Sequence, residues 1–156
     1  MAFIEAELKA ERERRTGQEA RGQALITTSG ALVTLLVGVA AVVKTAATLR
    51  FPPSVSITVG TALLLFAVAA GCGVAVGWNR HYAVAKATTL TRMLTDHWTD
   101  DEVDARNHVA TLLVETLGTL RRANELKARW VLVGLVVQVV ALIALCAAAI
   151  TTVANA

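Results

Sequence analysis

The stretch VSITVGTALLLFAVAAGCGVAVGW, residues 55–78, is 24 residues long and contains no Asp, Glu, Lys, Arg or His. As a helix it would reach roughly 36 Å, which exceeds the hydrocarbon thickness of a bilayer. Because lipid offers the backbone no hydrogen-bond partner, a segment that crosses it must be helical. We therefore expect a transmembrane helix here, with the flanking segments assigned to one side of a membrane or the other.

Two further runs have the same character. Residues 24–43 carry no charge over 20 positions, and residues 130–153 carry none over 24. The whole chain is 55% hydrophobic but only 4% aromatic, with a mean hydropathy of +0.57, which is typical of membrane proteins. A cleaved signal peptide is disfavoured for the first run, because 23 residues rich in Glu and Arg precede it. The predicted fold is an all-α membrane protein with three transmembrane helices.

The basic residues predict the orientation of these helices. Of the 15 Lys and Arg residues, 13 lie in residues 1–23 and 79–129, and two lie in residues 44–54. The positive-inside rule therefore places the N-terminus and residues 79–129 in the cytosol, and makes residues 44–54 a short external hairpin loop. The net charge of +3 does not predict nucleic acid as a partner, because the basic side chains are interleaved with acidic ones.

The two predicted cytosolic segments have helical patterns. Residues 1–23 favour a solvated juxtamembrane helix, since their apolar stripe is thin. Residues 79–129 contain two blocks of apolar positions at helical spacing, and between them Thr99 and Glu102 have the T-x-x-E spacing of a capping box, which predicts a helix start. We expect two long helices that continue from the neighbouring spans and form a cytosolic hairpin with their apolar stripes facing each other.

Small residues recur at four-residue spacing in the first two spans. Gly30, Thr34 and Gly38 share one face of the first span, and Gly73 with Gly77 forms a GxxxG pattern in the second. Small side chains let helix backbones approach closely, either within one subunit or between copies. We interpret these five residues as helix-packing positions and predict a homo-oligomer.

Polar residues that would mark chemistry are scarce. Gln138 lies near the midplane of the third span, where we expect its amide to find a partner on another helix. The spacing of His81, His97 and His108 predicts neither a catalytic site nor a metal site, so we expect no enzyme activity, no cofactor and no metal. The spans also lack the ionisable residues of coupled carriers, which disfavours transport of that kind.

Two segments carry a family resemblance. EARGQALI at residues 19–26 leads into Gly30 of the first span, and LRRANELKA at residues 120–128 leads into the last span. With the layout of two close spans, a cytosolic helical stretch and a final span, the chain resembles the small bacterial membrane proteins of the Pycsar-effector and SLATT-like type. The resemblance implies an oligomeric effector of the bacterial inner membrane, which compromises that membrane when a cyclic nucleotide reports phage infection.

Any nucleotide contact would have to come from residues 79–129. Arg106, Arg121 and Arg122 are the candidates, because guanidinium groups pair with phosphate. The alternative is that these arginines only solvate a helix. The alternative function is a non-conducting, membrane-anchored helical scaffold that recruits a cytosolic partner.

Overall fold

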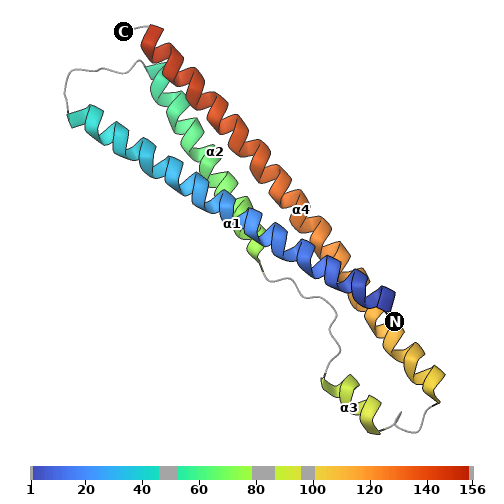
Figure 1. Cartoon of the computed structure of the whole chain (residues 1–156). Coiled ribbons are helices and arrows are strands. Elements are labelled where there is room, and N and C mark those ends of the chain that lie inside the picture. The colour runs from blue at the N-terminus through green and yellow to red at the C-terminus, as the bar shows by residue number, and fades with distance from the viewer. Residues whose placement is uncertain (1, 46–52, 79–86, 96–100, 155–156) are drawn as a thin grey trace. The chain divides into compact units, whose positions relative to one another are not determined.

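The computed structural model of the chain describes residues 2–45, 53–78, 87–95 and 101–154 (Figure 1). All the described secondary structure is helical, and the helices are α1 Ala2–Thr45, α2 Pro53–Gly77, α3 Ala87–Thr95 and α4 Glu102–Ala154. Most of the predicted external loop, as well as His81 and His97, lies outside the described residues.

Three of these helices are long and apolar enough to cross a membrane. The apolar stretches belong to α1, α2 and α4, in agreement with the three charge-free runs of the sequence. The prediction of an all-helical chain with three long apolar helices is therefore confirmed. The predicted juxtamembrane helix and the first span belong to one helix, α1, and the second cytosolic block and the third span belong to α4.

The start of α4 lies close to the predicted helix start. The helix begins at Glu102, and the backbone N–H of Ala105 donates to the carbonyl oxygen of Asp101 at 3.1 Å. Thr99 lies outside the described residues. Of the first predicted hairpin helix the structure describes only α3, nine residues long, and α2 ends at Gly77. The hairpin arrangement stays a prediction.

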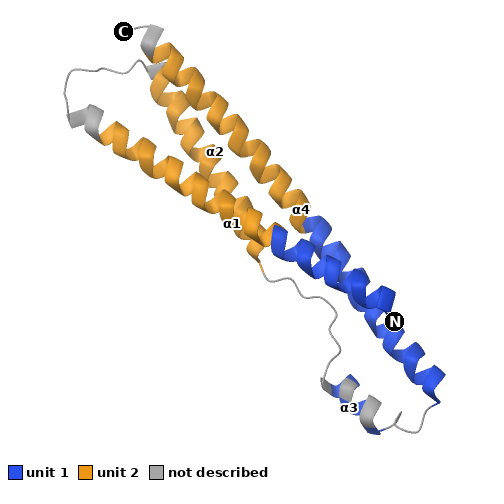
Figure 2. Cartoon of the chain, in the orientation of Figure 1, with its two compact units in different colours: residues 1–17, 79–126 blue, residues 18–78, 127–156 orange. Residues whose placement is uncertain are grey.

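The chain forms two compact units, which Figure 2 shows in two colours. The first comprises Met1–Gly17 and Asn79–Leu126, and the second comprises Gln18–Trp78 and Lys127–Ala156. Within the first unit we call the pair formed by residues 2–17 and 102–126 the stem. The second unit, which holds the three apolar stretches, we call the bundle.

The bundle contains three packed helices whose directions alternate. Gly22 of α1 lies against Gly73 of α2, while Ala40 and Val55 line one cavity, so these two helices run antiparallel. Gly134 of α4 lies beside Cys72 and Ala69, while Ala148 and Thr152 line the same cavity as Val55, so α4 is antiparallel to α2 and parallel to α1. Phe66 is fully buried in this core. These directions are those that three consecutive spans require.

Buried positions in α1 and α4 recur every three or four residues or at multiples of seven. In α1 they are Leu8, Glu11, Gln18, Gly22, Leu25 and Ser29. In α4 they are Leu120, Asn124, Lys127, Val131, Gly134, Ala141 and Ala148. This is the 3.5-residue period of coiled-coil packing. We call these the seam positions, and several of them carry polar or charged side chains.

Candidate functional site

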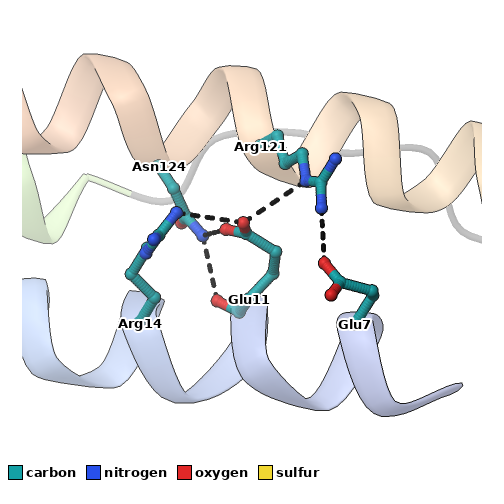
Figure 3. Close-up of polar contacts among 5 residues, drawn as sticks. All are labelled: Glu7, Glu11, Arg14, Arg121 and Asn124. Atoms are coloured by element: carbon teal, nitrogen blue, oxygen red, sulfur yellow. Dashed lines mark hydrogen bonds and ion pairs between the residues drawn. The ribbon is translucent and has the colours of Figure 1, made fainter. Parts of the chain in front are cut away.

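A polar network links the two helices of the stem (Figure 3). The carboxylate of Glu11 is at its centre, although Glu11 is only 5% exposed. Its Oε2 accepts a hydrogen bond from Nδ2 of Asn124 at 2.9 Å, and its Oε1 lies 3.2 Å from Nη1 of Arg14 and 3.4 Å from Nε of Arg121. Nη2 of Arg121 also donates to Oε2 of Glu7 at 2.5 Å. The buried carboxylate thus has two guanidinium groups and an amide around it.

Asn124 is the least exposed member of this network, at 2%. Its Nδ2 donates both to the carboxylate and to the backbone carbonyl oxygen of Glu11, each at 2.9 Å. Because both partners are acceptors, they fix which end of the amide faces α1. The opposite end, Oδ1, is buried without a hydrogen-bond partner, a situation that typically costs about 1–3 kcal/mol.

Few apolar side chains of the stem are fully buried, although Ile4, Leu112, Leu113 and Leu117 are half-buried. Among its described side chains, the buried hydrophobic residues are Leu8 and Leu120, whereas those of the bundle are ten. The stem therefore combines a thin apolar seam with polar contacts, and polar residues at such positions specify register.

The burial of Glu11 differs from the expectation that residues 1–23 form a solvated juxtamembrane helix. One face of this segment is buried, at Leu8 and Glu11, and its hydrogen bonds place that face against α4. The sequence missed this because a helix face with Glu at a seam position has the composition of a solvated face. The signal present in the sequence was the 3.5-residue spacing of positions 4, 8, 11, 15 and 18.

The three arginines proposed for nucleotide contact do not form one cluster. Arg106 pairs with Glu102 on its own helix at 2.5 Å, and Arg121 pairs with the carboxylates of α1. Because 15 residues separate them, they stand roughly 22 Å apart along α4. Arg122 is exposed.

A second polar contact joins α1 and α4 inside the bundle. Nε2 of Gln138 donates to Oγ1 of Thr28 at 2.9 Å, and this hydroxyl in turn donates to the carbonyl oxygen of Ala24 at 2.8 Å. The expected interhelical partner of Gln138 is thus Thr28. Measured interhelical bonds of this type within membranes are worth about 0.6–2 kcal/mol.

Lys127 adds a buried cation that the sequence analysis did not single out. Its side chain is 2% exposed, and its Nζ lies 2.5 Å from Oε1 of Glu19. Both residues belong to the bundle, close to the points where the charge-free runs of α1 and α4 begin. Removing Glu19 would leave a buried ammonium group unpaired, which is strongly unfavourable.

Of the predicted packing glycines, Gly73 lies in a close helix contact within the chain. A Cβ at Gly73 would lie 2.6 Å from the carbonyl oxygen of Gly22, so the backbones of α1 and α2 touch here. At Gly30, Gly38 and Gly77 a Cβ would meet nothing within 4 Å among the described residues beyond its own helical turn. Thr34 is exposed and donates to the carbonyl oxygen of its own helix at residue 30.

Two close-packed glycines were missed by the sequence analysis. A Cβ at Gly22 would lie 2.9 Å from Cβ of Val76, and one at Gly134 would lie 2.9 Å from Cδ1 of Leu25. Gly22 lies outside the charge-free run, and Gly134 is the single glycine of the third run, so neither belongs to a small-xxx-small pair. Their seam positions were the available signal.

In the described part of the chain, no group of three or more His, Cys, Asp and Glu residues is arranged to hold a metal ion. Comparisons of the chain with protein-family models, curated proteins and solved structures gave no match.

Proposed function

We propose that the chain is a multi-pass protein of the bacterial inner membrane, with a cytosolic N-terminus, whose copies assemble and permeabilise the membrane when a signal reaches the stem. The observation that carries this proposal is the hydrogen bond between Gln138 and Thr28. This bond holds an amide within an apolar helix stretch. When the two helices move apart, water can replace Thr28 as the partner of that amide. A small displacement of α4 from α1 would then favour a wetted path.

Assembly is supported by how little of each apolar stretch is buried within one chain. The buried share is 11% in α1, 33% in α2 and 22% in α4, so most of this surface is available to lipid or to other copies. Gly30, Gly38 and Gly77 leave helix faces on which another backbone can approach closely. Because the apolar stretches offer no ring of charges, the proposed path is a nonselective leak.

The signal in this proposal is a cyclic nucleotide, as the family resemblance implies, and it is read by the stem. Arg122 is exposed there and available to a phosphate, whereas Arg121 is held by Glu7 and Glu11. A phosphate that pairs with Arg121 would have to replace these carboxylates. Binding and loosening of the stem would therefore be one event. The activity requires no catalytic residue.

Membrane potential in intact cells tests the proposal. The protein is co-expressed with an inducible nucleotide cyclase, and a potential-sensitive dye is followed after the cyclase is induced. Wild-type protein should depolarise the cells, and Gln138→Leu should blunt the response at equal abundance because the wettable group is gone. Thr28→Val removes only the partner of the amide, so depolarisation should persist or increase. Val139→Leu, an exposed neighbour on α4, is the matched control and should behave as wild type.

The scaffold function is the competing outcome of this experiment. If triggered wild-type protein leaves membrane potential and viability unchanged, the permeabilising function is rejected and a membrane-anchored scaffold takes its place. Equal depolarisation by wild type and Gln138→Leu would reject the role of the Gln138–Thr28 contact.

A further inference from the structure

We infer that the face of α4 formed by Arg121 and Asn124 is a docking site for an acidic helix of a partner protein, and that Glu7 and Glu11 occupy this site as an internal, displaceable ligand. The inference goes beyond the proposed function, because it names a second class of ligand for Arg121, a protein carboxylate instead of the proposed nucleotide phosphate, and requires no membrane leak.

The donors of this site are arranged around carboxylates. The guanidinium of Arg121 contacts the carboxylate of Glu7 at 2.5 Å and that of Glu11 at 3.4 Å, and the amide of Asn124 donates to the second of these at 2.9 Å. Hydrogen bonds of charged groups are stronger and more geometrically specific than those of neutral groups. The site is therefore selective for carboxylates over neutral side chains.

The spacing of the contacts defines the kind of partner. Glu7 and Glu11 are one helical turn apart, and they meet Arg121 and Asn124 in the same order along α4. Residues at i and i+4 share one face of a helix, about 6 Å apart. A matching ligand is thus a helix that lies parallel to α4 and carries two carboxylates one turn apart, with an apolar residue near the position of Leu8.

The internal ligand is held in a way that permits exchange. The side chains of Arg121 and Glu7 are 49% and 37% exposed, so an incoming carboxylate can reach the guanidinium from solvent. Buried polar contacts give register more than net stability, because desolvation offsets much of their attraction. In the pairing with α1, Oδ1 of Asn124 receives no hydrogen bond. A partner helix that supplies a donor would satisfy one more buried polar atom than α1 does.

Because α1 and α4 belong to the same chain, α1 binds the site as a tethered ligand, and a partner protein must compete with it. A tethered ligand acts at an effective concentration of millimolar order. A partner therefore displaces α1 only when it is abundant or fits the site better, which makes the internal contact an autoinhibitory one.

The direct test uses a fluorescein-labelled synthetic peptide of residues 2–17 as the acidic helix. It is titrated into the full-length protein in detergent, in which Glu7→Gln and Glu11→Gln weaken the internal ligand, and fluorescence anisotropy reports binding. The peptide should bind this variant at least tenfold more tightly than it binds wild type, whose site is occupied. A peptide with Gln at both positions should bind at least tenfold more weakly, and added salt should weaken the acidic peptide.

Two changes on α4 provide the specificity control. Arg121→Ala, introduced into the same variant, should abolish peptide binding, whereas Arg106→Ala should leave it unchanged because Arg106 pairs within its own helix. Absence of binding, equal binding of the Gln peptide, or equal loss with Arg106→Ala would each overturn the inference. Circular dichroism checks that the variants retain their helix content.

A measurement on wild-type protein covers the case in which the variant does not fold. Excess isotopically labelled peptide, distinguished by mass, should speed hydrogen exchange in residues 2–17 of the full-length chain, and unchanged exchange would reject displacement. If copies of the protein that carry different tags co-purify through residues 2–17 without any peptide, the site belongs to a second copy, and the assignment to a partner protein is wrong.

Discussion

Glu11 and Asn124 are polar side chains at seam positions that coiled-coil packing ordinarily fills with aliphatic residues. Both are buried, and they bond to each other across the stem. Polar residues at such positions specify register at some cost in stability. The preference of the stem for one alignment of α1 on α4 is thus a property of these two residues and of Arg121.

Replacing both buried polar residues by leucine should stabilise the stem. We expect Glu11→Leu with Asn124→Leu to raise the free energy of unfolding by about 1–4 kcal/mol, because apolar packing replaces desolvated polar groups. Either change alone should lower it by about 1–3 kcal/mol, since one buried polar group loses its partner. Hydrogen exchange of residues 2–17, followed by mass spectrometry, measures the difference.

The control is Glu5→Leu with Glu125→Leu, which introduces two leucines at exposed positions near the network. These should change the stability of the stem by less than about 0.5 kcal/mol. A double seam variant that is less stable than either single variant would show that the network contributes net stability and does not act mainly on register.

At the scale of helices, the sequence predicted the elements better than their contacts. Charge-free length determines where an apolar helix lies, and α4 begins at Glu102, within the segment that the Thr99-to-Glu102 spacing pointed to, although the capping contact of Thr99 lies outside the described residues. It was harder to predict which helix packs against which face, because small residues permit a close helix contact without determining which helix makes it. Gly73 packs inside the chain while Gly77, in the same GxxxG pattern, does not.

Alanine substitution should separate these two glycines. Gly73→Ala would place a methyl group 2.6 Å from the carbonyl oxygen of Gly22, so α1 and α2 must move apart. We expect a loss of about 1–3 kcal/mol in bundle stability, typical of overpacking. Gly77→Ala meets open space and should leave stability unchanged, although the oligomer distribution can shift. Thermal unfolding in detergent measures both. Equal destabilisation by both variants would contradict the observed packing.

At the scale of the whole molecule, the alternating directions of α1, α2 and α4 in the bundle agree with a chain that crosses a membrane three times. Orientation in the membrane rests on the distribution of Lys and Arg in the sequence. The 3.5-residue spacing could have located the seam, but it could not have shown that Glu11 is buried, because a buried Glu and a solvated Glu leave the same local pattern. The partners Arg121 and Lys127 lie more than 100 residues from their acidic side chains.

Cysteine accessibility scanning tests the proposed topology. On a background with Cys72→Ala and Cys146→Ala, a cysteine at position 110 should be protected from a membrane-impermeant maleimide in intact cells. Cysteines at positions 52 and 155 should react, because the proposed orientation places both outside. After the cells are permeabilised all three should react, which controls for buried thiols. Labelling of position 110 in intact cells would reverse the proposed orientation.

The parallel pairing of α1 with α4 also has a consequence for biosynthesis. Glu11 bonds to a residue 113 positions later in the chain, and Glu19 to one 108 positions later. At about 5–20 residues per second, a ribosome needs roughly 5–20 seconds to synthesise the intervening segment. During this interval the acidic face of α1 has no α4 to pair with, although α1 and α2 have already been synthesised. The nascent N-terminal helix therefore depends on solvent or on another protein until the last helix emerges.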